Sequence, residues 1–169
     1  MRYRAVSLAL AAAAVLGSTT VAQAQRHVRF GLAGTGIFSL EDGGGSRFGG
    51  MALVQAGPSH GLGFRADLTV THGDDFTSEI ATVDAVYTFH TPESLFHPYL
   101  LGGLGLYHQS DLTKPLAKAG LGLEYHIKQR NRGTVIFGEL TGNFLFAGEG
   151  YGGTSKSLQA NIGLKFGGE

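Results

Sequence analysis

The sequence has 169 residues, of which 28 are glycine and only 15% carry a charged side chain, and its formal net charge is zero. It contains no cysteine, which excludes disulfides and thiol chemistry, and it lacks the basic excess that nucleic-acid binding requires. Glycine is more than twice as frequent as the usual value of about 7% and lies within apolar segments, without a collagen-like period.

The N-terminal segment has the features of a secretory signal peptide. Two arginines lie within the first four residues, residues 5–16 are mostly apolar, and Ala22-Gln23-Ala24 offers the small residues that a signal peptidase recognises. The apolar stretch is shorter than the about 20 residues of a transmembrane helix. We therefore predict a signal peptide at residues 1–24 and a single domain at residues 25–169, with 11 Lys and Arg against 13 Asp and Glu.

The remainder of the chain alternates between apolar and polar residues with period two. Between residues 62 and 71, apolar side chains occupy every even position, and glycine, threonine or charged side chains occupy every odd position. Such alternation is typical of a β-strand with two different faces. The same pattern, interrupted by turn residues, predicts eight strands at about 27–38, 47–57, 62–71, 79–89, 98–108, 116–127, 134–146 and 157–166.

The length and the two faces of these strands favour a barrel that crosses a membrane. Most of the segments exceed the common strand length of about 5–6 residues and match the 9–11 residues that a tilted strand needs to cross a bilayer. A soluble carrier barrel would direct its apolar face inward, whereas a membrane barrel directs it toward lipid. We predict an all-β fold, an eight-stranded antiparallel up-and-down transmembrane β-barrel, with a soluble barrel as the alternative.

Aromatic residues cluster near the strand ends, while the middle positions are aliphatic or glycine. Two such girdles are expected where rings lie at the level of the lipid headgroups. The alternation is less decisive in residues 47–57 and 98–108, and the facing of residues 98–108 stays open because both of its faces are apolar or glycine. The first predicted girdle contains Phe30, Phe64, Tyr87, Phe89, Tyr99, Tyr125 and Phe166, and the second contains Phe38, Phe48, Tyr107, Phe144 and Phe146.

An eight-stranded barrel is just wide enough for side chains to fill its interior. Eight charged residues fall on the face predicted to point inward: Arg29, Arg65, Asp67, Asp84, Lys118, Glu124, Glu139 and Lys165. Asn143, Gln159 and Asn161 fall on the same face. Because an unpaired buried charge is costly, we predict that the four basic and four acidic groups form a structural charge network. The interior would then be polar and plugged, with little or no conductance.

The chain resembles the outer-membrane protein β-barrel domain family in two successive segments. These are Pro98-Tyr99-Leu100-Leu101-Gly102-Gly103-Leu104-Gly105-Leu106-Tyr107 and Ala119-Gly120-Leu121-Gly122-Leu123-Glu124-Tyr125. This family comprises eight-stranded barrels akin to the transmembrane domain of OmpA, OmpX and the opacity proteins. The resemblance implies a bacterial outer-membrane location and specifies architecture rather than activity. It implies outer-membrane lipids and lipopolysaccharide as partners of a monomer, and the barrel-assembly machinery during insertion. Residues 158–166 resemble the C-terminal signal for that machinery, although Gly167-Gly168-Glu169 follow its aromatic residue.

Candidate catalytic residues are few. Some barrels of this size modify lipid A, and one deacylase group carries a His-x-Ser-Asn motif that His108-Gln109-Ser110-Asp111 resembles. The deacylase motif lies on the seventh strand, however, where this chain has Glu139-Leu140-Thr141-Gly142-Asn143. The seven histidines are scattered without ligand-type spacing, and rim or turn positions account for them. We predict no catalytic, cofactor or metal site, no enzyme activity and no nucleic-acid partner.

The predicted function is therefore that of a structural, envelope-integrity or surface-interaction protein of the outer membrane. The first alternative is the passage of small apolar molecules through the barrel wall, which the charged inward face disfavours. The second and less favoured alternative is a lipid A-modifying hydrolase.

Overall fold

The computed structural model describes residues 28–41, 45–73, 76–92, 94–110, 112–127, 133–146 and 154–167. The predicted signal peptide at residues 1–24 lies outside these ranges. Eight strands are present: β1 (Val28–Ser39), β2 (Ser46–Ala56), β3 (Gly61–His72), β4 (Thr77–Thr88), β5 (Phe96–Gln109), β6 (Leu112–His126), β7 (Val135–Leu145) and β8 (Ser155–Gly167). Within the described ranges, no helix is long and apolar enough to cross a membrane.

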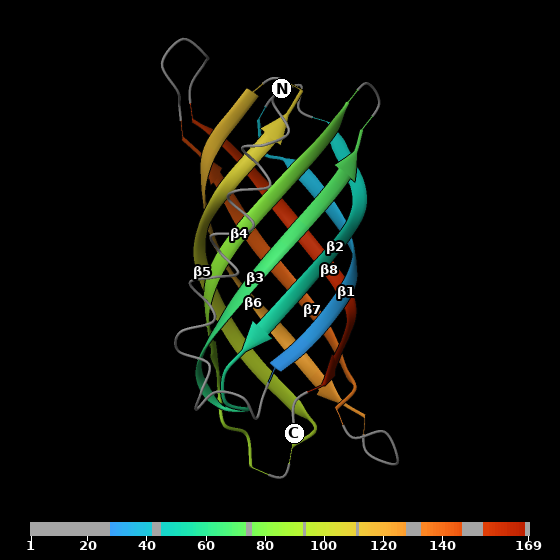
Figure 1. The fold of residues 1–169 in the computed structure, drawn as a ribbon, viewed down its shortest axis with the longest axis vertical. Coiled ribbons are helices and arrows are strands. Elements are labelled where there is room, and N and C mark those ends of the chain that lie inside the picture. The colour runs from blue at the N-terminus through green and yellow to red at the C-terminus, as the bar shows by residue number, and fades with distance from the viewer. Residues whose placement is uncertain are drawn as a thin grey trace.

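The eight strands form one closed antiparallel barrel in sequence order, with β1 paired to both β2 and β8 (Figure 1). The predicted fold class is confirmed. We call the end at which β1 begins and β8 ends the terminal end, and the opposite end the distal end. In Figure 1 the terminal end is at the bottom, and the strands run steeply inclined to the barrel axis.

The predicted strand limits agree with the observed ones except around residues 109–115. The sequence predicts a connection from Gln109 to Pro115, because Ser, Asp and Pro in this segment are typical turn residues. In the structure, β5 continues to Gln109 and β6 already begins at Leu112, so Pro115 lies within β6 opposite Leu106. The carbonyl of Pro115 accepts a hydrogen bond of 3.0 Å from the backbone N–H of Phe146. Pro115 has no N–H to donate, but its carbonyl still takes part in the backbone hydrogen bonding.

The outer surface of the barrel is apolar. Ile162 and Leu104 are 70% and 69% exposed, whereas the inward side chains Arg65 and Lys165 are 1% and 0% exposed. Exposed aromatic side chains gather at both ends of the barrel. At the terminal end they include Phe30, Phe64, Tyr87, Phe89, Phe96 and Phe166, and at the distal end they include Phe38, Phe48, Phe144 and Phe146. Aliphatic residues occupy the band between them.

The structure fixes the facing of β5, which the sequence left open. Tyr99, Leu101 and Tyr107 point into the barrel and are at most 5% exposed, whereas Leu100 and Leu104 point outward. The placement of Tyr99 and Tyr107 in the outer girdles is therefore wrong. Gly103 and Gly105 lie on the same inward face as the two tyrosines. Glycine is needed at both positions because β5 passes close to β4, and a methyl group there would overlap the β4 backbone.

The interior is not polar throughout, in contrast to the prediction from the sequence. One group of buried apolar side chains lies toward the distal end and comprises Ile37, Ile80, Tyr107, Leu116 and Leu145. Two smaller groups contain Met51, Leu53 and Phe137, and Val86, Tyr99 and Leu101. These apolar residues lie on the same inward strand faces as polar residues. The alternating pattern therefore predicted which face of a strand points into the lumen, but not how polar the lumen is.

Candidate functional site: the barrel interior

All eight charged residues predicted to point inward lie in the interior, and each is at most 7% exposed. They come from six strands and form two groups. The middle cluster contains Arg65, Asp67, Asp84, Lys118 and Glu139, and the terminal cluster contains Arg29, Glu124 and Lys165. In a ring of eight strands, β3 and β7 lie on opposite walls. Ion pairs within these clusters therefore bridge the lumen as well as neighbouring strands.

Arg65 is the centre of the middle cluster. Its guanidinium Nη1 lies 2.7 Å from Glu139 Oε2 on the opposite wall. Its Nη2 lies 3.0 Å from Asp84 Oδ2, and its Nε lies 3.2 Å from Asp67 Oδ2. The planar guanidinium suits this role, because it presents several N–H donors in a fixed geometry.

Lys118 shares two of these carboxylates. Its ammonium lies 2.7 Å from Asp67 Oδ2 and 2.9 Å from Asp84 Oδ2, and it donates a hydrogen bond of 2.8 Å to the Thr82 hydroxyl. Lys118 is on β6 and Asp67 on β3, so this pair also crosses the lumen. The middle cluster holds two cations and three carboxylates, and the terminal cluster holds two cations and one carboxylate. The positive and negative charges of the interior are therefore equal in number only when both clusters are counted together.

The terminal cluster is arranged around Glu124. Arg29 Nη1 lies 2.9 Å from Glu124 Oε2, and Lys165 Nζ lies 2.7 Å from Glu124 Oε1. Lys165 also donates a hydrogen bond of 2.8 Å to the side-chain oxygen of Gln55. The three charged residues come from β1, β6 and β8, so this cluster joins the strands at which the barrel closes to the β6 wall.

Tyr99 connects the two clusters, a role that the sequence did not reveal. The ammonium of Lys165 lies 4.8 Å from the ring centroids of both Tyr99 and Phe137, and the Tyr99 hydroxyl donates a hydrogen bond of 2.8 Å to Glu139 Oε2. A cation over an aromatic face is stabilised by the ring quadrupole. Parity alone did not reveal this role, because glycine lies on both faces of β5, Gly102 in step with Leu100 and Gly103 in step with Tyr99.

The predicted amides extend the polar network toward the distal end. Asn161 Nδ2 donates to Glu139 Oε1 at 2.7 Å, Gln159 Nε2 donates to Asn161 Oδ1 at 3.1 Å, and Asn143 Nδ2 donates to Gln159 Oε1 at 3.0 Å. Beyond the amides lies the apolar group that includes Ile37, Ile80 and Leu116. The lumen is thus filled by ion pairs, amides and an apolar layer in succession.

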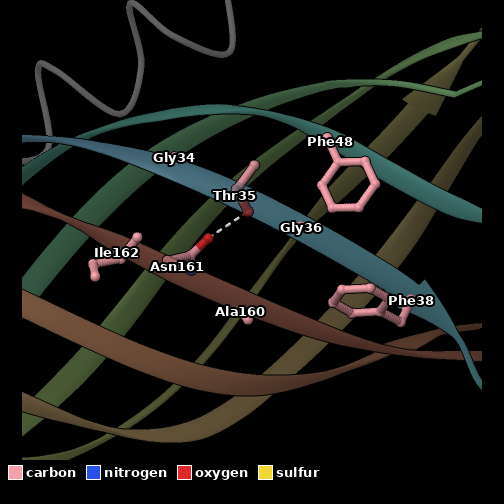
Figure 2. Close-up of a pocket in the computed structure, with 8 residues that line it drawn as sticks. All are labelled: Gly34, Thr35, Gly36, Phe38, Phe48, Ala160, Asn161 and Ile162. Carbon is pink, nitrogen blue, oxygen red and sulfur yellow. Dashed lines mark hydrogen bonds between the residues drawn. The ribbon is translucent and has the colours of Figure 1, made fainter.

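An apolar groove of about 340 Å³ lies on the outer wall, where β1 and β8 meet (Figure 2). Gly34, Gly36 and Ala160 leave the space, and the rings of Phe38 and Phe48 border it. Figure 2 also shows the hydrogen bond from the Thr35 hydroxyl to Asn161, which joins the two strands at this position. The β1–β8 ladder is continuous from Arg29 and Gly167 to Ser39 and Ser157, so the seam is closed behind the groove.

The residues that resemble a deacylase motif do not form a triad in the described part of the chain. His108 Nδ1 lies 2.9 Å from the hydroxyl of Thr113. Ser110 lies in the β5–β6 turn with a φ of 54°, and Asp111 lies outside the described residues. Glu139, the carboxylate of the seventh strand, is engaged by Arg65, Tyr99 and Asn161.

Comparison with solved structures places the barrel among known folds. Neisserial surface protein A aligns over 83% of this chain and 96% of its own, with a TM-score of 0.66 and 17% sequence identity. The N-terminal β-barrel domain of Pseudomonas aeruginosa OprF aligns over 82% of this chain and 97% of its own, with a TM-score of 0.54 and 17% identity. A major outer membrane protein from Thermus thermophilus aligns over 82% of this chain and 98% of its own, with a TM-score of 0.56 and 12% identity.

This chain has the fold of the small outer-membrane barrels. The three proteins have only 12–17% sequence identity to it, so the likeness concerns the fold. No family model and no curated protein matches the sequence.

Proposed function

We propose that the protein is a closed, non-conducting barrel of the bacterial outer membrane with a structural, envelope-integrity or surface-contact role. One observation carries the proposal: Arg65 on β3 and Glu139 on β7 approach to 2.7 Å across the lumen. The pair lies in a network that links opposite walls. Such a network stabilises the barrel and obstructs an aqueous path along its axis.

The outer surface supports the membrane location. Its aliphatic band lies between two belts of exposed aromatic rings, which is the arrangement expected of a barrel in lipid. Closure also leaves no unpaired strand edge, as a bilayer requires of any spanning sheet. In this proposal the outward face contacts outer-membrane lipids and lipopolysaccharide, the working unit is a monomer, and the barrel-assembly machinery recognises β8 during insertion.

Neither alternative function is favoured by a specific contact. Passage of apolar molecules through the wall would require an opening between strands, and the groove at β1 and β8 has a continuous ladder behind it. A lipid A-modifying hydrolase would require a nucleophile activated by a base, and His108 contacts Thr113 instead.

Conductance tests the proposed function. The purified protein is reconstituted into planar bilayers, and the recording is compared with that of a general porin under the same conditions. We expect no ion-conducting steps, because the charged clusters and the apolar layer fill the lumen. Stable channel steps would overturn the closed interior.

Location is tested separately by cell fractionation, with unheated and boiled samples on a denaturing gel. We expect the protein in the outer-membrane fraction, with a change in migration on boiling because the closed barrel resists detergent until heated. A soluble periplasmic protein would overturn the membrane location.

A further inference from the structure

Four of the seven histidines meet at the terminal end of the barrel, although the sequence separates them widely. His60 lies in the β2–β3 turn, His90 follows β4, His97 is near the start of β5 and His126 ends β6. The ring centroids are 4.5 Å apart for His60 and His90, 5.1 Å for His60 and His97, and 4.5 Å for His97 and His126. We call these residues the histidine cluster. All four occupy rim or turn positions, as predicted, but their spacing in the sequence did not show that their rings meet.

The two central members each have a ring nitrogen without a partner among the described residues. The Nδ1 atoms of His60 and His97 are buried and make no hydrogen bond to the described residues. Buried polar side-chain atoms normally have a partner, so two orphaned imidazole nitrogens on neighbouring rings indicate a missing one. At the distal end, by contrast, Nδ1 of each histidine has a hydroxyl partner. His72 is paired with Thr77, and His108 is paired with Thr113.

The spacing of the rings suits a shared metal ion. Two imidazole nitrogens about 2.0–2.1 Å from a tetrahedral ion place their ring centres about 5 Å apart. The three observed centroid distances lie close to that value. The backbone therefore holds each ring at about that separation from the next one in the row His90, His60, His97 and His126.

His126 has the environment of a metal ligand with a supporting carboxylate. Its Nε2 lies 3.5 Å from Glu124 Oε2, and Glu124 is held in turn by Arg29 and Lys165. Histidines that bind metals commonly donate their second ring N–H to a carboxylate, which sets the tautomer and orients the ring. Because Nε2 lies toward Glu124, His126 would bind the metal through its other ring nitrogen, Nδ1.

We propose that the histidine cluster binds one divalent transition-metal ion of the zinc type at the terminal mouth of the barrel. His60, His97 and His126 supply nitrogen ligands, and His90 or a water molecule completes the coordination. Imidazole ligands suit zinc, copper and nickel, whereas calcium and magnesium prefer oxygen. Glu124 acts through His126 and is a positioning residue.

Binding requires the rings to turn. Among the described residues, no three potential metal ligands already converge on one point. The rings now pack edge to face, with interplanar angles of 72–83°. The three proposed ligands are only partly buried and one of them is in a turn, so rotation about the side-chain bonds can redirect their nitrogens.

The test is a zinc titration of the folded full-length barrel in detergent, followed by calorimetry. We expect one zinc ion per barrel, and an affinity at least about 10-fold lower in His60→Gln and in His97→Gln. The matched controls are His72→Gln and His108→Gln, which each remove a histidine at the distal end; both variants should bind zinc as the wild type does. Magnesium should give no binding, and acidification from about pH 7.5 to about pH 5.5 should release zinc.

A second measurement uses only the wild-type protein and does not depend on the folding of a variant. Diethyl pyrocarbonate modifies accessible imidazoles, and mass spectrometry locates the products. Zinc should protect His60 and His97 while leaving His72 and His108 equally reactive. Absence of zinc binding, or binding that the distal variants weaken as much as the cluster variants do, would overturn the proposal and leave edge-to-face packing as the reason for the cluster. Neither result depends on the conductance or location of the barrel.

Discussion

At the scale of single residues, the interior depends on a small number of shared charges. Arg65 alone contacts three carboxylates, and Glu124 alone holds two cations. Such groups are stabilising only as sets, because each charge has given up its hydration and relies on its partners. The loss of a shared partner therefore costs more than the loss of a charge at the surface.

Replacement of Arg65 tests this dependence. Arg65→Met leaves Asp67 and Asp84 with Lys118 but removes the cation beside Glu139, and we expect the free energy of unfolding to fall by about 3–5 kcal/mol. Urea titration of the reconstituted protein measures the change. The control is Lys156→Met, at an exposed position, for which we expect little effect.

A double variant separates lost packing from uncompensated charge. Arg65→Met combined with Glu139→Leu removes the stranded carboxylate, so part of the lost stability should return. If Arg65→Met were as mild as Lys156→Met, the middle cluster would not hold the barrel together.

At the scale of elements, the β1–β8 seam is the contact that closes the barrel. Gly163 on β8 faces Ala33 on β1 and points inward, and a methyl group there would overlap the carbonyl of Leu32 and the Cα of Ala33. Gly34 lies on the same seam but points outward, with no atom within 4 Å of the position of an added methyl group. The two glycines therefore offer a matched comparison on one pair of strands.

We expect Gly163→Ala to destabilise the barrel by about 1–3 kcal/mol, because the added methyl group must separate the closing strands. Gly34→Ala should be neutral or should stabilise by up to about 1 kcal/mol, since alanine loses less backbone entropy than glycine in a strand. Urea unfolding, together with the folded fraction on an unheated gel, measures both. Equal effects of the two substitutions would contradict the assigned facing of the seam.

At the scale of the whole molecule, the barrel is inverted relative to a water-soluble protein. Its ion pairs lie inside and its aliphatic side chains lie outside, with Leu104 and Ile162 among the most exposed. In water this surface would favour aggregation, whereas in a bilayer it is matched to its solvent. The environment of the outer wall is therefore the property that most needs a direct test.

Two arginine substitutions probe that environment. Leu104 is 69% exposed in the middle of β5, and Leu40 is 64% exposed just beyond β1 at the distal end. In lipid vesicles, we expect Leu104→Arg to lower the free energy of unfolding by about 2–4 kcal/mol and Leu40→Arg to lower it by about 0–1 kcal/mol. The difference arises because an arginine on the lipid face costs most at the middle of the bilayer and least near its surface. Small and similar effects would place both positions in water and favour a soluble barrel.

Much of the fold was predictable from the sequence because the facing of a strand residue is a local property. In β3, the alternation of Phe64, Arg65, Ala66 and Asp67 already separates lipid from lumen, and the observed burial follows it. The same rule failed for β5, where leucine and glycine occupy both faces and no polar residue marks the inside. Tyr99 was therefore assigned to a girdle although it packs against Lys165 and donates to Glu139.

The sequence by itself determined the eight strands and, in six of them, which side chains point inward, because the two faces of a strand repeat every second residue. Only the tertiary structure decided which inward residues meet, since closure and register bring together positions such as Arg65 and Glu139, or His60 and His97, that no local pattern relates. The physical reason is that a contact across the lumen depends on the pairing of all eight strands at once, whereas alternation depends on neighbouring residues alone.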